Sequence, residues 1–278
     1  MILRAPAKLN LCLYLGGRRE DGLHDLSSLT QALTLSDRIV VEGSSADQVR
    51  CEGVEGPNLA AAALGALRAR GWARAPVRIE IEKRIPVAAG LGGGSADAAA
   101  VLRLARDEVP GLDALAAELG ADVPSQLDPG LALISGAGER VEPLPPPAEY
   151  GVVLIPSSEG LSTAQVYAQA DRLGLGREPA ELEQVAAGVR DAAGSGASPV
   201  TYADLLVNDL QQAAVSLRPE IVEALDALSA AGAVRALVTG SGPTAVGLFE
   251  DVAAADRAAS ALPPRYADAA VAAPIAYR

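Results

Sequence analysis

A glycine-rich stretch between two regular patterns is the strongest constraint on how this chain can fold. Residues 77–83 (VRIEIEK) alternate apolar and polar side chains as a strand does, and an Ala-rich helical pattern covers 95–109. Between them, in PVAAGLGGGSADAAA (86–100), four glycines fall within five residues. Ordering glycine costs conformational entropy, so such a run indicates a backbone that another group approaches closely. The stretch predicts a strand, a glycine loop and a helix that begins beside a ligand.

The glycine loop fits none of three common phosphate-loop patterns. A Walker A loop needs Lys followed by Ser or Thr, but Ser95 and Ala96 follow Gly94. A Rossmann loop needs Gly or Ala where Ser95 stands, and the protein-kinase pattern is absent. A loop that leads into a helix N-terminus still favours an anion, because amide N–H groups and the helix dipole face it. Ser95 could cap that helix or hold a metal ion that bridges phosphates; an ordinary turn is the alternative.

Composition narrows the class of protein. The chain has 278 residues and is 50% hydrophobic, enough for a buried core and for two lobes. Its net charge of −12 argues against nucleic acid or an anionic membrane as a partner. We find no signal peptide and no apolar run of membrane-spanning length, so we expect no membrane partner. Cys12 and Cys51 lack metal-ligand spacing, and we interpret them as reduced thiols of a cytoplasmic protein.

Alternating patterns predict several strands in the first part of the chain. Residues 7–15 (AKLNLCLYL) predict a half-buried strand with a polar face that carries Lys8 and Asn10. The segments 26–35 and 37–43 predict two further strands. A polar working face on an otherwise apolar strand is a place where a site could form.

The rest of the chain predicts a second domain. Asn58 is expected to cap a helix. Clustered prolines in 143–150 mark a linker, so we expect domains at 1–149 and 150–278. The second half mixes a strand, helices, a strand–turn–strand unit, a helix and a strand, which is the pattern of an α/β sandwich. GSGPTA (240–245) is either a plain hairpin turn or a second glycine loop that leans on the first.

Together these segments resemble the GHMP kinase superfamily, named for galacto-, homoserine, mevalonate and phosphomevalonate kinases. The glycine loop is similar to its central motif. APAKLNLCLYLGGRREDGLHDL (5–26) and LGADVPSQL (119–127) resemble segments of members that act on a cytidine-diphosphate-linked methylerythritol, and NDLQ (208–211) and VTGSGPTAV (238–246) fit later segments. The resemblance implies an α+β, two-lobed fold. Its N-terminal lobe would be like domain 2 of ribosomal protein S5, its C-terminal lobe a ferredoxin-like α/β sandwich, and its active site would lie between them.

The resemblance also implies a reaction. This is ATP-dependent phosphorylation of the 2-hydroxyl of that cytidine-linked methylerythritol, in the non-mevalonate route to isoprenoid precursors, with ATP and Mg²⁺. The catalytic pair falls on Lys8 and Asp122, with Asp122 as general base and Lys8 offsetting charge on the transferred group. A monomer or weak homodimer is expected. The alternatives are a homoserine or mevalonate type of kinase and a non-catalytic nucleotide sensor on the same fold.

The substrate-binding residues follow from the same resemblance. His24 would recognise cytosine, Asn10 would help to hold the methylerythritol, and Tyr167 would stack on cytosine with Thr163 nearby. Leu23 stands where the family usually has a tyrosine that completes the aromatic sandwich. Because stacking on an aromatic ring contributes about 1–3 kcal/mol per base in single-strand binders, we expect weaker or differently shaped cytidine recognition.

The nucleotide would lie along the glycine loop. The resemblance places the adenosine end near Asn58 and Lys83, and Ser95 is the candidate ligand for the metal ion. The loop residues expected to bind nucleotide are Pro86, Val87, Ala88, Ala89, Gly90, Leu91, Gly92, Gly93, Gly94, Ser95 and Ala96.

Overall fold

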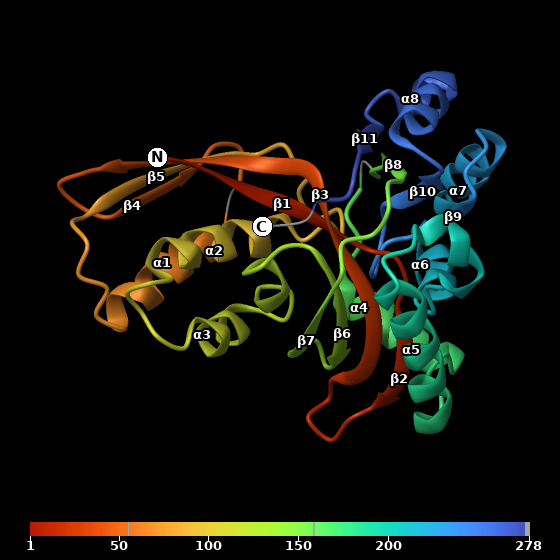
Figure 1. Ribbon diagram of the computed structural model, residues 1–278, viewed down its shortest axis with the longest axis horizontal. Coiled ribbons are helices and arrows are strands. Elements are labelled where there is room, and N and C mark those ends of the chain that lie inside the picture. The colour runs from red at the N-terminus through yellow and green to blue at the C-terminus, as the bar shows by residue number, and fades with distance from the viewer. Residues whose placement is uncertain (55, 158, 276–278) are drawn as a thin grey trace. The chain divides into compact units, whose positions relative to one another are not determined.

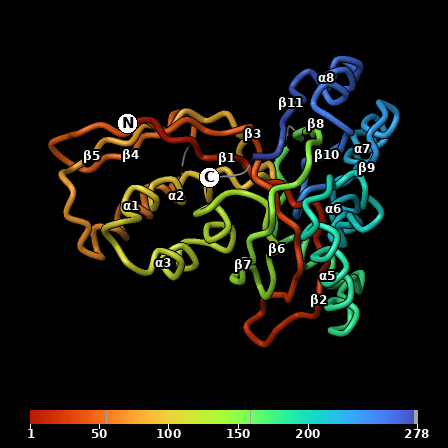
Figure 2. Tube along the Cα trace, viewed as in Figure 1, coloured from red at the N-terminus to blue at the C-terminus, as the bar shows by residue number. Residues whose placement is uncertain are grey.

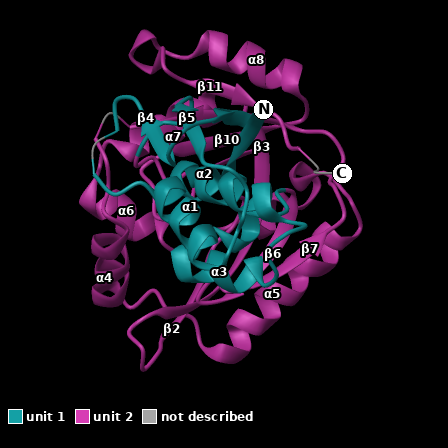
Figure 3. Cartoon of the chain, turned by 90° about the vertical axis from the view of Figure 1, so that its left-hand side faces the viewer, with its two compact units in different colours: residues 1–8, 35–87, 92–129 teal, residues 9–34, 88–91, 130–278 magenta. Residues whose placement is uncertain are grey.

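The computed structural model describes residues 1–54, 56–157 and 159–275, drawn as ribbons in Figure 1 and as a chain trace in Figure 2. They form two compact units, which Figure 3 colours separately. The units interleave along the chain, so each is assembled from several segments. Unit 1 comprises residues 1–8, 35–87 and 92–129, and unit 2 comprises residues 9–34, 88–91 and 130–278. Each unit is a set of residues that contact one another, which is not the same as a continuous domain of the chain. The domains at 1–149 and 150–278 therefore stay a prediction.

Strands of unit 1 form around the second half of a long strand, β3 (His24–Gly43). That half pairs antiparallel with β5 (Val77–Glu82), which pairs in parallel with β4 (Gln48–Cys51). β1 (Ile2–Asn10) also pairs with β3. The strand predicted at 77–83 is confirmed, because its alternate apolar side chains are buried while Glu80 and Glu82 are exposed.

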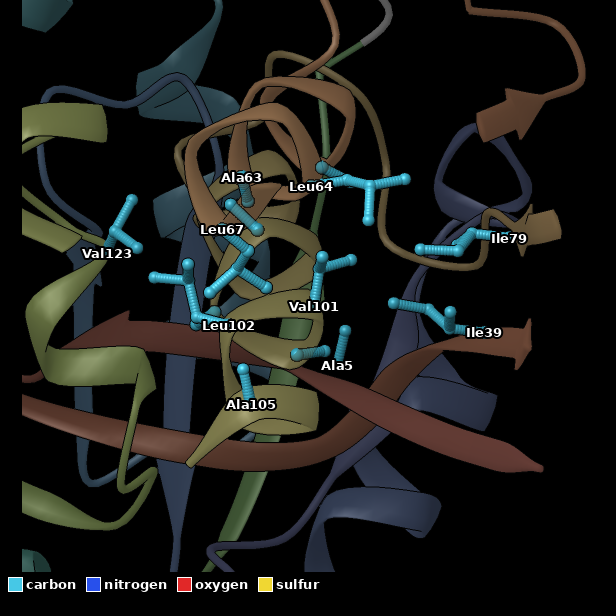
Figure 4. Close-up of a cluster of buried hydrophobic side chains, with 14 of the residues drawn as sticks. Ala5, Ile39, Ala63, Leu64, Leu67, Ile79, Val101, Leu102, Ala105 and Val123 are labelled. Carbon is cyan, nitrogen blue, oxygen red and sulfur yellow. The ribbon is translucent and has the colours of Figure 1, made fainter. Parts of the chain in front are cut away.

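The helices of unit 1 cover these strands and bury their apolar faces. They are α1 (Leu59–Ala69), α2 (Gly93–Leu102) and α3 (Leu112–Leu119), with 3-10 turns at η1 (Arg103–Ala105) and η2 (Pro124–Gln126). Figure 4 shows side chains from helices and strands meeting in one apolar cluster, which gives unit 1 its own core. Its members include Ala5, Ile39, Ala63, Leu64, Leu67, Ile79, Val101, Leu102, Ala105 and Val123.

The two predicted helix starts in unit 1 had different outcomes. Asn58 caps α1 as predicted, since its side-chain oxygen accepts the N–H groups of Ala60 and Ala61 at 2.9 and 3.3 Å. The helix start predicted at Ser95 is wrong, and of the two possibilities for Ser95, a cap or a metal ligand, the cap is not found. The helix begins at Gly93 because Gly92, in a left-handed conformation, already turns the chain into it. Ser95 therefore lies inside the first turn.

Unit 2 contains the first half of β3, with β6 (Leu131–Gly136) antiparallel beside it and β7 (Arg140–Leu144) beyond β6. The strands predicted at 26–35 and 37–43 are one continuous β3, so the predicted break between them is wrong. Each half of β3 has its own partner strand, which keeps the backbone extended through both.

The strand predicted at 7–15 is divided instead. β1 ends at Asn10 and β2 (Tyr14–Arg18) begins four residues later, because Leu13 turns to make a bridge with Asn208. The expected half-burial of this segment is also wrong. Its polar face is as enclosed as its apolar face, with Asn10 only 7% exposed.

The second sheet of unit 2 has four antiparallel strands in the order β11-β8-β10-β9. They are β8 (Gly151–Ile155), β9 (Arg235–Val238), β10 (Ala245–Phe249) and β11 (Ala270–Ala272). Strand, helices, strand, strand, helix and strand follow one another along the chain, which is the ferredoxin-like order. The predicted α/β sandwich and the α+β class are thereby confirmed, as is the strand–turn–strand unit of β9 and β10.

Helices flank this sheet, with α7 and α8 packed against its strands. The helices and 3-10 turns of unit 2 are α4 (Thr163–Leu173), α5 (Pro179–Gly194), η3 (Pro199–Leu205), α6 (Gln211–Leu217), α7 (Ile221–Ala230), α8 (Val252–Ala261) and η4 (Pro264–Tyr266). Over the described part of the chain, no helix combines the length and the apolar character needed to cross a lipid bilayer.

Candidate active site

Lys8 and Asp122 form an ion pair within unit 1, with 3.6 Å between the Lys8 Nζ and an Asp122 carboxylate oxygen. The Lys8 side chain is only 8% exposed near the end of β1, whereas that of Asp122 is 51% exposed. Asp122 is held in position because Val123, the next residue, is buried in the core of unit 1. A sheltered cation beside an accessible carboxylate can offset charge on an incoming group while the carboxylate accepts a proton.

Gly92 lies directly against Lys8 at the start of α2. Its backbone is left-handed (φ 68°, ψ 20°). A Cβ at this position would lie 2.7 Å from the Lys8 Cγ. Glycine is therefore required both for the turn and for the close approach. The first N–H groups of α2 have no acceptor inside the helix, so this end of the loop favours an anion. The structure thus brings Lys8, Asp122 and the start of α2 together from three distant parts of the chain.

Lys83 belongs to a buried cluster with two aspartates behind the same helix start. Its ammonium is 2.9 Å from Asp97 and is also bonded to Asp37. A Cβ on Gly93 would lie 3.0 Å from the Lys83 Nζ, so the ammonium sits against the first turn of α2. Asp37 is fully buried, and its other oxygen accepts the backbone N–H groups of residues 84 and 85 at 2.6 and 2.8 Å.

Burial and neighbouring charges shift the pKa values of Lys83 and Asp97 in opposite directions. Burial alone would lower the pKa of the Lys83 ammonium, but its bonds to Asp37 and Asp97 outweigh burial and raise that pKa. Burial is also the main influence on Asp97, and it raises the pKa of this carboxyl to about 7 against the pull of Lys83. The cluster therefore keeps Lys83 charged directly behind the glycine loop.

Lys83 also borders a surface hollow in unit 1. Its volume is about 870 Å³, and Lys83 but not Asn58 is among the described residues that line it. The lining residues are Arg38, Val40, Arg50, Cys51, Glu52, Glu80, Ile81, Glu82 and Lys83. The hollow is large enough for part of a nucleotide, whereas the side-chain oxygen of Asn58 is committed to the cap of α1.

Two substitutions at Asn58 separate its cap from a role in nucleotide binding. Asn58→Ala is expected to lower the free energy of unfolding by about 1 kcal/mol, because the cap is lost. Asn58→Asp keeps a capping oxygen and suits the helix dipole, so stability is expected to stay near that of the wild type. If the Asn58 amide donates to adenosine, ATP affinity falls in both variants. Chemical denaturation and calorimetric titration with ATP measure the two effects, and unchanged ATP affinity in Asn58→Asp would remove this residue from the nucleotide site.

In unit 2 the first part of the glycine loop, residues 88–91, packs against the turn at 240–245. The Thr244 hydroxyl donates to the Ala89 carbonyl at 2.7 Å. A Cβ on Gly90 (φ +77°) would lie 2.8 Å from the Gly242 carbonyl oxygen. Of the two readings of GSGPTA, the second glycine loop that leans on the first is the one found. Within the loop Ala88 has a positive φ of 56°, which is strained for a residue with a side chain.

Asn10 and Asn208 form hydrogen bonds with residues at the start of the second glycine loop and directly before it. The Asn10 backbone N–H donates to the Thr239 hydroxyl at 2.9 Å, and its side-chain amide donates to Ser28 at 2.7 Å. The Asn208 amide donates to the carbonyls of residues 238 and 240, both at 2.7 Å. Buried polar side chains that are satisfied in this way fix the conformation of the loop.

The expected cytosine-binding residues gather around α4. The His24 ring lies 5.2 Å from the Tyr167 ring, centre to centre, and its Nε2 is 2.6 Å from an Asp171 carboxylate oxygen. The Thr163 hydroxyl is 2.9 Å from the Ser241 hydroxyl in the second glycine loop. Leu23, beside His24 in sequence, is 55% exposed. The effect of Leu23 on cytidine recognition stays a prediction.

Sequence reasoning missed several residues of this arrangement. Asp37, Asp171 and Ser241 were not selected, because each meets its partner across a long stretch of chain. The one local signal was the spacing of four between Tyr167 and Asp171, which puts both on one face of a helix. Pro86 and Val87, by contrast, were selected and are exposed.

The donor groups around the loop fit a metal ion that arrives with a nucleotide. In the ranges that the structure describes, no group of three or more His, Cys, Asp or Glu side chains is arranged to hold a metal ion. Mg²⁺ is usually held by a few protein oxygens together with substrate phosphates. Ser95, half-buried in the first turn of α2, offers such a hydroxyl oxygen.

Comparison with known proteins gives matches over most of the chain. Residues 58–127 match the family described as GHMP kinases N terminal domain, and residues 178–268 match GHMP kinases C terminal. The 4-diphosphocytidyl-2-C-methyl-D-erythritol kinase of Nocardia farcinica is 44% identical over 279 residues, covering 94% of this chain and 89% of the relative.

Solved structures show the same likeness. A crystal structure of 4-(cytidine 5'-diphospho)-2C-methyl-D-erythritol kinase superimposes with a TM-score of 0.80 at 38% identity, covering 98% of each chain. Homoserine kinase from Cytophaga hutchinsonii gives a TM-score of 0.71 at 18% identity, covering 99% of this chain and 94% of that one. The second likeness is one of fold alone.

Proposed function

Because this chain belongs to the GHMP kinase family and is an ATP-dependent kinase of a small molecule, we propose that its acceptor is 4-diphosphocytidyl-2-C-methyl-D-erythritol. The product would carry a phosphate ester on the 2-hydroxyl, in the non-mevalonate route to isoprenoid precursors. The names of its relatives support this acceptor. The observation that carries the proposal is the Lys8–Asp122 pair against Gly92, which supplies a cation, a carboxylate and a helix N-terminus.

The glycine loop is the proposed binding site for the triphosphate. Amide N–H groups at the start of α2 would bind phosphate oxygens, and Lys83, whose charge Asp37 and Asp97 balance, would hold the first turn of α2 in place behind them. Ser95 is the proposed protein ligand for Mg²⁺, which when bound would neutralise charge on the phosphates. The adenosine would enter the hollow that Lys83 borders.

The chemical step needs one base and one cation. The 2-hydroxyl oxygen forms a bond to the γ-phosphorus as the bond between that phosphorus and the β-phosphate oxygen breaks. Asp122 accepts the hydroxyl proton, and Lys8 stabilises the charge that gathers on the transferred group. ADP is the leaving group, and Asp122 then returns the proton to solvent.

The proposed acceptor site uses residues of unit 2. His24 and Tyr167 would bind the cytosine ring, and the distance of 5.2 Å between the centres of their rings supports this role. Asn10 would orient the methylerythritol, since it lies two residues after Lys8 on β1 and so points to the same side of that strand.

A panel of acceptors tests the proposal. The purified protein is given ATP and Mg²⁺ with 4-diphosphocytidyl-2-C-methyl-D-erythritol, homoserine, mevalonate or no acceptor, and ADP is measured. We expect ADP release to depend on the cytidine-linked compound. Turnover with only homoserine or mevalonate would overturn the proposed acceptor. ATP binding without turnover on any acceptor would point to the non-catalytic sensor.

A further inference from the structure

Asp171 makes a close hydrogen bond to the single histidine of the chain. The His24 Nε2 lies 2.6 Å from an Asp171 oxygen. The His24 side chain is only 6% exposed, while that of Asp171 is 38% exposed. The two residues are 147 positions apart, so the fold rather than local sequence brings them together. A bond of this length to a carboxylate is charge-assisted and strongly directional.

The same helix face supplies the aromatic partner of the histidine. Thr163, Tyr167 and Asp171 are spaced by four residues in α4 and therefore lie along one side of it. Thr163 meets Ser241 of the second glycine loop at one end of this row, and Asp171 meets His24 at the other. α4 thus fixes the orientation of the imidazole with a ring contact and a hydrogen bond from adjacent turns.

The Asp171 contact also determines which ring nitrogen carries the proton. An ionised carboxylate only accepts hydrogen bonds, so the neutral imidazole must present N–H at Nε2. Its Nδ1 is then an acceptor. We propose that Asp171 is a positioning residue that holds His24 in the Nε2–H form, so that Nδ1 accepts a hydrogen bond from the 4-amino group of a pyrimidine.

The proposal rests on the proposed function and goes beyond it, because it assigns the selection of cytosine over uracil to Asp171. Cytosine presents an amino donor at position 4, whereas the corresponding 4-oxo group is an acceptor. An acceptor at Nδ1 can bind the amino group of cytosine, but it repels the 4-oxo group of uracil. In Asp171→Asn the side-chain amide can donate to Nε2, which would move the ring proton to Nδ1 and weaken the discrimination.

Nuclear magnetic resonance tests the first half of this proposal without any substrate. Because His24 is the only histidine, a ¹⁵N-labelled sample gives a single imidazole pattern. We expect the Nε2–H form in the wild type at pH 8 and a shift toward the Nδ1–H form in Asp171→Asn. Asp256→Asn, which removes an exposed carboxylate from α8 of the same unit, is the matched control and should leave the pattern unchanged. A wild-type ring in the Nδ1–H form would overturn the proposal.

Binding of cytidine 5'-diphosphate and uridine 5'-diphosphate tests the second half. We expect the wild type and Asp256→Asn to bind the cytidine compound about tenfold more tightly or better, and Asp171→Asn to lose most of that preference. In a His24→Ala background Asp171→Asn should cause no further change, because Asp171 acts through His24. An additional loss in that background, or an unchanged preference in Asp171→Asn, would overturn the role of Asp171.

The two measurements also separate this inference from the proposed acceptor. Binding of cytidine diphosphate with the preference unchanged in Asp171→Asn overturns the inference and leaves the acceptor standing. Binding of neither nucleotide diphosphate overturns both the acceptor and the selection of cytosine. With the full acceptor, Asp171→Asn should raise KM while kcat stays close to the wild-type value, since Asp171 does not touch the reacting atoms. Melting temperatures of all variants exclude unfolding as the cause.

Discussion

Asp122→Asn is expected to abolish phosphoryl transfer while ATP binding stays nearly unchanged. The amide has the shape of the carboxylate but cannot accept the proton of the 2-hydroxyl, and loss of a general base lowers rates by about 10²–10⁴-fold. Because the Asp122 side chain is 51% exposed, loss of its ion pair with Lys8 should cost about 1 kcal/mol of stability or less. Turnover number, ATP dissociation constant and melting temperature are measured on the same preparation.

The matched control for this prediction is Asp128→Asn in the same unit. Asp128 is also exposed and also pairs with a cation, at 2.7 Å from Arg106. Both substitutions remove one negative charge and the ion pair of an exposed carboxylate. They differ in the cation left behind, which is the buried Lys8 for Asp122 and the exposed Arg106 for Asp128, and in the proposed general base. Normal turnover in Asp122→Asn would show that Asp122 is not the base, and equal losses in both variants would indicate an effect of charge alone.

Local signals in the sequence predicted those parts of the fold that depend on neighbouring residues. The alternation in 77–83 predicted β5, and Asn58 predicted the start of α1, because each signal and its structural effect lie within a few residues. The strand–turn–strand unit at β9 and β10 is of the same kind. Such features depend on backbone geometry and burial that the local pattern already contains.

Elements that depend on distant partners were not predictable in this way. The segment 7–15 reads as one strand, yet it divides because Leu13 bridges to Asn208, far along the chain. The sequence predicts that the helix begins at Ser95, but α2 begins at Gly93, because Gly92 must turn sharply against Lys8. Neither contact leaves a periodic trace in the sequence.

The residues of the candidate site also fall into two groups, those that a local motif predicts and those that only their distant contacts reveal. Lys8, Asp122 and the glycine loop were selected because their motifs resemble a family, and the structure brings Lys8, Asp122 and the end of the loop at Gly92 together in unit 1. Their roles stay a proposal that the substitutions above test. Asp171 and Asp37 carry no motif of their own. Their significance follows only from the groups they contact, His24 and Lys83.

Asp37→Ala is expected to be among the most destabilising single changes in unit 1, lowering the free energy of unfolding by about 3–5 kcal/mol. It would leave two backbone N–H groups, one of them buried, without their acceptor and Lys83 with only Asp97. Chemical denaturation measures the loss. Glu82→Ala is the control, because this exposed side chain also pairs with cations and its loss should cost about 1 kcal/mol or less.

Asp37→Asn keeps the argument testable if the alanine variant does not fold. Its side-chain oxygen can still accept the two backbone N–H groups, but its amide cannot balance the Lys83 ammonium, so an intermediate loss is expected. ATP affinity should fall as well, because Lys83 would lose the carboxylate that fixes it against the first turn of α2. A loss in Asp37→Ala no larger than in Glu82→Ala would show that the buried cluster does not hold unit 1 together. Full stability combined with lost ATP affinity would instead assign the cluster to nucleotide binding alone.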